Sequence, residues 1–119
     1  MKTSSAKSKG RNFEKALVEI LYEEFPELEE GDVEWRSMGS AGIDLILSPK
    51  ARKLFPISVE AKNTKIKPGP AAMEQAKANI YDDTVAVVAW KPPRKNIKEG
   101  VAMLDFRDLA RLIKLVRNQ

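Results

Sequence analysis

The sequence predicts a single α/β domain in which a mixed central β-sheet is flanked by helices on both faces. Strand-like and helix-like patterns follow one another in the order α-β-β-β-α-β-β-α. The most β-rich stretch, Thr84 to Trp90, is apolar enough to be a central strand buried on both faces. With 119 residues, 43% of them apolar, the chain can bury the core of one domain without disulfides or a structural metal.

The first helix is expected to follow a short basic tail. Residues 1–8 are rich in Lys and Ser and show no apolar pattern, so we expect a flexible tail there and one domain over 9–119. The helix is predicted to begin near Lys9 and to end before Pro26. Its apolar stripe repeats every four residues, at Phe13, Leu17, Leu21 and Phe25.

Three short strands are predicted next. They are expected at Val33 to Arg36, Ile43 to Leu47 and Phe55 to Ala61. A loop of small residues, 37–42, separates the first two. A polar turn over 48–53 would join the last two as a hairpin.

The second half of the chain is predicted to alternate between helix and strand. Pro70 suits the first turn of a helix that runs to about Tyr81. After the central strand, Val101 to Leu104 form another strand, and Asp105 caps a final helix that ends near Val116. This last helix is expected to lie as a lid on the sheet, with Leu109, Leu112, Ile113 and Val116 on its apolar face.

Composition excludes much of enzyme chemistry. The chain has no His and no Cys, so a Cys nucleophile, a His general base, a Ser-His-Asp triad and a Cys/His zinc site are all ruled out. Catalysis would have to use carboxylates, Lys, Ser or Tyr, together with a hard, oxygen-binding metal. No apolar run is long enough to cross a membrane, and the first residues lack the apolar core of a signal peptide. We therefore expect a soluble, cytoplasmic protein.

Charge is distributed unevenly along the chain. Residues 1–11 carry four bases and no acid, residues 12–34 carry nine acids and one base, and residues 35–119 carry sixteen bases and eight acids. These segments sum to the net charge of +4. The pattern is compatible with a polyanion bound on one side, or simply with a solvated surface.

An acidic pair gives the clearest local signal. Glu60 and Lys62 share one face of the strand that ends near Ala61, because side chains alternate along a strand. Asp44 interrupts the neighbouring strand, and in a hairpin it would lie near Glu60. Like charges held together need a compensating cation. One interpretation is a Mg²⁺ site at Asp44 and Glu60, with Lys62 beside it. The other is a salt-bridged hairpin with no chemistry.

These residues resemble the signature of a nuclease superfamily. Gly42-Ile-Asp44-Leu-Ile, followed by Glu60-Ala-Lys62 at the end of an apolar strand, resembles the PD-(D/E)XK motif, with Ile43 in the place of Pro. The segments Lys9 to Glu14, Arg36 to Gly42 and Glu74 to Ala76 further resemble archaeal-type Holliday junction resolvases, which also occur in phages and would then act in the host cytoplasm. The resemblance implies a restriction-endonuclease-like fold.

The resemblance also implies roles for individual residues. Asp44 and Glu60 would bind Mg²⁺, for which Mn²⁺ can substitute, and the Ala61 carbonyl would face the metal. Lys62 would be the catalytic lysine, Glu14 a further acid of the site, and Ser40 a residue near the scissile phosphate. The positions that would contact DNA are Lys9, Arg11, Arg36 and Gln75. Taken alone, Glu14, Ser40 and Gln75 are also compatible with a solvated charge, a turn residue and helix surface.

DNA, in particular four-way junctions, is the expected partner. Basic residues in three predicted loops would contact the phosphate backbone without reading sequence. They are Lys50, Arg52 and Lys53, then Lys65 and Lys67, and then Lys91, Arg94, Lys95 and Lys98. Symmetric cutting of a junction requires two sites, so the resemblance implies a homodimer. Candidate interface residues are Met73, Ile80, Trp90 and Leu104, although each of them is more simply explained as part of the core.

Three functional hypotheses remain at this point. The first is a Mg²⁺-dependent, structure-selective DNA endonuclease that resolves four-way junctions. The second is a nuclease of the same fold that acts on flaps, ends or other DNA. The third is a non-catalytic nucleic-acid-binding module in which the acids are structural.

Overall fold

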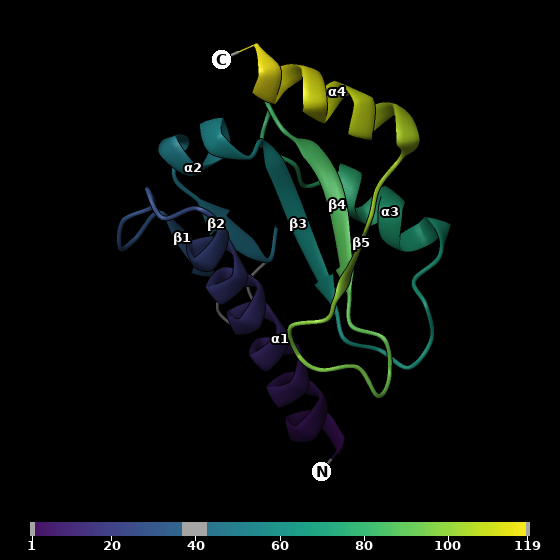
Figure 1. Cartoon of the computed structure of the whole chain (residues 1–119). Helices are drawn as coiled ribbons and strands as arrows, with labels where there is room; N and C mark the ends of the chain where they lie inside the picture. The colour runs from purple at the N-terminus through teal and green to yellow at the C-terminus, as the bar shows by residue number, and fades with distance from the viewer. Residues whose placement is uncertain (1, 37–42, 119) are drawn as a thin grey trace.

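The protein is a mixed α/β fold with helices and two β-sheets (Figure 1). The computed structural model describes the backbone of residues 2–36 and 43–118, with side chains from Lys9 onward. The elements are α1 (Lys2–Glu24), β1 (Val33–Trp35), β2 (Leu45–Leu47), α2 (Pro49–Leu54), β3 (Ile57–Lys62), α3 (Pro70–Lys77), β4 (Val85–Trp90), β5 (Val101–Met103) and α4 (Phe106–Arg117).

The larger sheet has the strand order β3-β4-β5. β3 and β4 run parallel, with Glu60 opposite Val88, and β5 pairs antiparallel with β4. β4 is central and its first five residues are buried, which confirms the prediction from its continuous apolar sequence. Phe13 of α1 packs in a core cluster with Val59 and Ala89 of this sheet.

Helices cover both faces of the larger sheet. Ala76 of α3 packs against Ala86 and Val88, whose side chains alternate with those of Val87 and Ala89 along β4. α1 lies on the opposite face, as Figure 1 shows. The general α/β architecture, with helices on both sides of a sheet, therefore agrees with the sequence-based prediction.

The predicted hairpin around 48–53 is wrong. β2 pairs antiparallel with β1, with Glu34 opposite Ile46, and forms a separate two-stranded sheet. A short helix, α2, occupies the expected turn because the Ser48 side chain accepts a hydrogen bond from the Ala51 N–H and Pro49 suits the first helical position. The element order and strand order consequently differ from those expected, and there are two sheets in the described chain where one was predicted.

Helix boundaries also differ from the predictions. α1 begins at Lys2, so the segment predicted to be a flexible tail is helical in its described part. No proline interrupts residues 2–10, and Gly10 costs a helix only about 1 kcal/mol relative to Ala. α3 ends at Lys77, before Tyr81, whose backbone N–H donates to the buried Ser58 hydroxyl at 2.9 Å.

α4 is not the predicted lid. None of its residues, all of which the structure describes, is buried, and its apolar side chains lie largely in solvent. Asp105 stands at its N-cap position, but its carboxylate pairs with Lys77 at 2.6 Å and makes no side-chain cap hydrogen bond.

Gly100, in the connection between β4 and β5, lets this connection pass close to Phe13 of α1. A Cβ atom at Gly100 would lie 2.8 Å from the ring of Phe13, which is fully buried. The ring cannot move away without disturbing the core, because interiors are closely packed.

We predict that Gly100→Ala lowers the free energy of unfolding by about 1 to 3 kcal/mol, the usual range for overpacking. Chemical denaturation measures the change. Gly69→Ala is the matched control, since a Cβ there meets nothing within 4 Å, and it should lower stability by less than about 1 kcal/mol, the cost of alanine at the N-cap of α3. Equal stability of the Gly100→Ala and Gly69→Ala variants would contradict this packing account.

Candidate functional site

The C-terminal end of β3 carries the acid and the lysine of the predicted motif. Glu60 is buried, with 8% of its surface exposed, and Lys62 is half-buried. The Lys62 Nζ lies 3.7 Å from a carboxylate oxygen of Glu60. Their alternation along the strand places both side chains on one face, as the sequence indicated.

Asp44, the residue before β2, lies against this strand. Its backbone N–H donates to the Val59 carbonyl at 3.1 Å, and its carboxylate accepts a hydrogen bond from the Ala61 N–H at 2.7 Å. Asp44 therefore lies across from Glu60, although β2 and β3 form no continuous ladder. The Asp44 carbonyl in turn accepts from the Arg36 N–H at 2.8 Å, which ties the end of β1 to the same place.

Glu14 brings a third carboxyl group to the site from α1. Burial, together with the negative charges of Asp44 and Glu60, raises the pKa of Glu14 from 4.5 to about 7. Its buried Oε1 has no hydrogen-bond partner among the described residues. A buried acceptor with no partner inside an acidic cluster is the environment that a cation or a proton would stabilise.

The electrostatic balance of the site favours a cation. Burial raises the pKa of Asp44, and the hydrogen bond from Ala61 and the charges of Lys62 and Arg36 oppose that shift. Burial also raises the pKa of Glu60, with a further increase from Asp44, while Lys62 lowers it. Three carboxyl groups thus share the site with Lys62, and Arg36 adds positive charge near Asp44. The described residues hold no ready-made group of three metal ligands, so Asp44 and Glu60 supply a two-carboxylate site at most.

Such a site fits the chemistry of Mg²⁺. This ion prefers one or two carboxylates and keeps several waters, to which phosphate oxygens can be added. Asp44 and Glu60 provide oxygen ligands of the right kind, and the unpartnered oxygen of Glu14 can accept a hydrogen bond from a bound water. The role of the Ala61 carbonyl stays a prediction.

Two contacts near the site were not predicted. The Asn63 side chain donates to the Lys9 carbonyl at 3.1 Å, which links the residue after Lys62 to α1. The Trp90 indole N–H donates to the Thr64 carbonyl at 3.0 Å and anchors the loop that follows β3. No sequence pattern indicated either contact, because the partners are backbone carbonyls far away in the chain.

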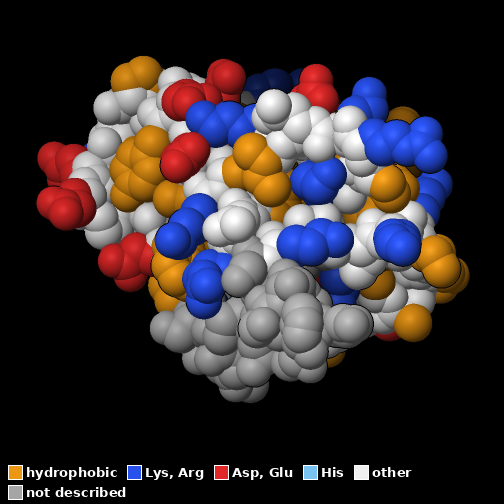
Figure 2. All heavy atoms as spheres, turned by 90° about the horizontal axis from the view of Figure 1, so that it is seen from below, with side chains coloured by type: hydrophobic (Ala, Val, Ile, Leu, Met, Phe, Trp, Pro, Cys, Tyr) orange, Lys and Arg blue, Asp and Glu red, His pale blue; other side chains and the backbone are white. Residues whose placement is uncertain are grey.

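Lys and Arg side chains gather at this end of the molecule. Figure 2 looks onto the end where β3 and β4 finish, and blue side chains are spread over this face while red ones lie toward its margins. The exposed lysines Lys65 and Lys67 belong to the loop after β3. Arg94 and Lys95 belong to the loop after β4 and are also exposed. Lys98 differs, since it is paired with Glu19 and Glu23 of α1 at 3.3 and 2.6 Å.

The remaining predicted DNA contacts have different surroundings. Lys9 is exposed and Arg11 half-buried on α1. The Arg36 guanidinium donates through Nε to the Ile43 carbonyl, so it already has a structural partner. Gln75 is exposed on α3. Ser40 lies outside the described residues.

The basic residues of α2 lie at the other end of β3. Arg52 donates to the Leu47 carbonyl at 2.7 Å and stacks 4.4 Å from the centre of the Tyr81 ring. Lys50 is 3.9 Å from acidic oxygens of both Glu29 and Asp32. These basic residues and Lys53 belong to α2, which lies just before the start of β3. Glu60 and Lys62 lie at the end of β3. The structure thus separates α2 from the acidic cluster.

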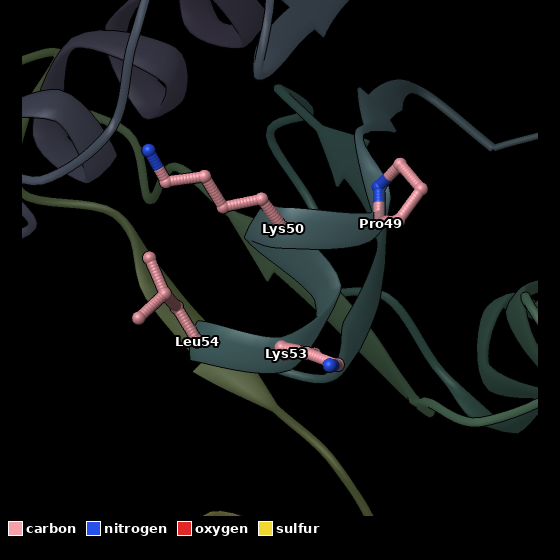
Figure 3. Close-up of a pocket in the computed structure, with 4 residues that line it drawn as sticks. All are labelled: Pro49, Lys50, Lys53 and Leu54. Atoms are coloured by element: carbon pink, nitrogen blue, oxygen red, sulfur yellow. The ribbon is translucent and has the colours of Figure 1, made fainter.

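A hollow of about 460 Å³ lies beside α2 and is lined by Pro49, Lys50, Lys53 and Leu54, which Figure 3 shows as sticks. The side chains of Lys50 and Lys53 extend in different directions from the helix. Because the amino groups do not converge, this hollow is a poor candidate for binding a single anion.

Comparison with protein-family models, with curated proteins and with solved structures finds no match to this chain. The resemblance to nucleases therefore rests on the sequence motifs alone. In the described part of the chain, no helix is long and apolar enough to span a membrane.

The raised pKa of Glu14 predicts a pH-dependent stability. A carboxyl group with a higher pKa in the folded state destabilises that state progressively as pH rises from about 4.5 to about 7. In metal-free protein, Glu14→Gln should therefore be more stable than the parent at pH 8 and equal to it at pH 4. Because the group is only half-buried, screening reduces the effect to about 1 kcal/mol, or a melting temperature higher by about 4 °C.

Thermal denaturation in EDTA at both pH values measures this difference. Glu24→Gln, an exposed glutamate of the same helix, is the control and should show no such pH dependence. If Glu14→Gln raised the melting temperature equally at pH 4 and pH 8, the elevated pKa would not be its cause.

Proposed function

We propose that the protein is a Mg²⁺-dependent, structure-selective DNA endonuclease, with four-way junctions as its preferred substrate. One observation carries this proposal: Asp44, Glu60 and Lys62 converge at the end of β3, where burial raises the pKa of both carboxyl groups. The resemblance of the motif to PD-(D/E)XK nucleases supports the reaction class. The exposed bases in the loops after β3 and β4 support a polyanionic substrate.

Each residue of the site has a definite task under this proposal. Asp44 and Glu60 would hold Mg²⁺, or Mn²⁺ in its place. The ion supplies Lewis-acid polarisation of the phosphate and a water of lowered pKa. The Ala61 N–H fixes the orientation of the Asp44 carboxylate through the 2.7 Å hydrogen bond. Lys62 supplies positive charge beside Glu60, where negative charge develops on the phosphate during hydrolysis.

The preference for junctions is the finer part of the proposal. It is supported by the segments that resemble archaeal-type resolvases and by the absence of a recognisable base-reading motif in the sequence. The phosphate-binding residues give affinity for backbone geometry rather than for sequence. A nuclease acting on flaps or ends, or a binding module without catalysis, makes different predictions in the same assay.

We predict that Glu60→Gln lowers the rate of DNA cleavage by at least about 100-fold. The substitution removes one of the two carboxylates proposed to bind the metal, and the neutral amide does not replace its charge. The variant should fold, because Gln is of similar size and removes a buried charge. Glu34→Gln, an exposed glutamate on β1, is the control and should cleave at the parent rate. The assay compares labelled four-way junction, flap, linear duplex and single-stranded DNA, each with Mg²⁺ or EDTA.

Paired nicks in the junction alone, lost in EDTA and in Glu60→Gln, are the expected result. Equal cleavage of the other substrates would contradict the junction preference. Salt-sensitive binding without cleavage in Mg²⁺ or Mn²⁺ would contradict the enzymatic proposal as a whole.

A second prediction concerns the DNA-binding face. Replacing Lys65 and Lys67 together by Ala should weaken binding to every DNA substrate. It should also reduce the slope of log K against log salt by up to about 2, since each phosphate contact contributes roughly 0.9. The matched control is Lys50→Ala on α2, which lies at the far end of β3 and should leave the slope unchanged. A larger loss of DNA affinity for Lys50→Ala than for the double substitution of Lys65 and Lys67 would contradict binding of DNA at this face.

A further inference from the structure

The loop after β3, residues 63–69, exposes one large aliphatic side chain between two lysines. Ile66 is 82% exposed, and its neighbours Lys65 and Lys67 are exposed as well. Because burial of an isoleucine is favourable, a side chain left in water to this extent gains from any apolar surface that covers it. A single exposed apolar residue is ordinary on protein surfaces. It is the setting of Ile66 that indicates a ligand.

The backbone that carries Ile66 is held in place. The Trp90 indole N–H donates to the Thr64 carbonyl at 3.0 Å, and the Thr64 hydroxyl donates to the Ile66 carbonyl at 2.8 Å. Pro68 follows, and a proline restricts the residue before it, here Lys67, to extended conformations. The loop therefore loses little conformational freedom when Ile66 enters a ligand, and the entropic cost of binding is low.

The loop lies beside the candidate catalytic lysine. Ile66 follows Lys62 by four residues, so their Cα atoms are at most about 14 Å apart. The Lys62 carbonyl accepts a hydrogen bond from the Lys91 N–H at 3.0 Å, which holds the start of the β4–β5 connection next to the start of this loop. Both connections extend beyond the ends of β3 and β4 in Figure 1. A ligand that covers Ile66 would thus lie against the basic face near the acidic cluster.

Phe106 is equally exposed but has a different setting. It begins α4, which crosses beyond the opposite end of β3 and β4 in Figure 1. Its preceding neighbour is an acid, Asp105, which pairs with Lys77 at 2.6 Å. Of the two most exposed large apolar side chains in the described chain, only Ile66 is flanked by cations on both sides.

Nucleic acid is a ligand that uses both kinds of contact. Lysines such as Lys65 and Lys67 bind the phosphates. An aliphatic side chain such as Ile66 covers the face of a base, and proteins that kink DNA insert isoleucine or leucine between two base pairs. Insertion into a continuous duplex is costly because it breaks the stacking of a base step. At a branch point the strands pass from one helix to another, so part of that stacking is already lost.

We propose that Ile66 is a wedge that inserts between bases at the branch point of a DNA junction, while Lys65 and Lys67 contact the flanking phosphates. The wedge makes binding favour branched over continuous DNA, a selectivity that phosphate contacts alone do not provide. Ile66 is thus a specificity-determining residue and not a catalytic one. The inference rests on the proposed function for DNA as the partner, and it requires neither metal binding nor cleavage.

Competition binding in EDTA, at one salt concentration, tests the selectivity without cleavage. Ile66→Ser should weaken binding to a four-way junction by about 10-fold and binding to linear duplex by less than about twofold. Ile66→Leu keeps an aliphatic side chain and should bind both substrates as the parent does. Because Ile66 is exposed, neither substitution should prevent folding.

The possible failures of this assay are distinguishable. A parent protein that binds no DNA would overturn the wedge and the proposed function together. If the parent binds DNA and Ile66→Ser keeps its junction-to-duplex ratio, the wedge is overturned and the nuclease proposal stands. Equal losses on junction and duplex would likewise overturn the wedge, since they would make Ile66 a contact without selectivity.

The fluorescent base 2-aminopurine locates the inserted side chain. Its emission rises when it is unstacked, and an aliphatic neighbour does not quench it. Placed at the branch point of the junction, it should brighten on saturation with the parent protein or with Ile66→Leu, but not with Ile66→Ser. Placed in the middle of an arm, it should not respond to any of the three proteins. An equal rise at the branch point with Ile66→Ser would overturn the proposal.

Discussion

The hydrogen bond from the Ala61 N–H to the Asp44 carboxylate connects the two sheets at the candidate site. β1 and β2 form one sheet and β3, β4 and β5 form the other, so no continuous ladder fixes their relative position. Together with the backbone contact from Asp44 to Val59, this bond places a carboxylate beside the buried end of β3. The position of every other candidate catalytic group is defined relative to this junction.

This arrangement is electrostatically unfavourable for the ionised carboxyl groups. Burial raises the pKa of Asp44, Glu60 and Glu14, and the negative charges reinforce one another at Glu14 and Glu60. Lys62 offsets only part of this repulsion. Groups that a fold keeps in such an unfavourable environment are often functional, because stability alone would favour apolar or paired residues there. The charge imbalance is the reason to propose a divalent cation and, with it, phosphodiester chemistry.

The sequence predicts the elements better than their pairing. Continuous apolar character was enough to identify Thr84 to Trp90 as the central strand, since burial on both faces leaves a strong signal. Asp44 and Glu60 were expected together from a hairpin that does not form. They lie close together because the Asp44 N–H donates a hydrogen bond to the Val59 carbonyl of β3. The helix α2 was missed because Ser48-Pro49 is equally typical of a turn and of a helix start.

Surface properties were the least predictable. Lys50 and Arg52 look like DNA-binding residues in the sequence, but their positions and partners depend on α2 and on Tyr81, which is remote in the chain. The amphipathic pattern of α4 predicted an apolar face correctly, and it could not show whether the chain itself covers that face. Asn63 and Trp90 bind backbone carbonyls, for which a sequence carries no distinctive pattern.

The central claim is that the acidic cluster is completed by a divalent cation, and a carboxyl-carbon NMR titration of Glu14 tests it directly. We predict a pKa of about 7 for Glu14 in metal-free protein. Saturating Mg²⁺ should lower that pKa by at least about one unit, equivalent to about 1.4 kcal/mol, and Glu60→Gln should abolish the Mg²⁺ effect. An unchanged Glu14 pKa in Mg²⁺ or Mn²⁺ would contradict the account and leave the cluster as an architectural feature.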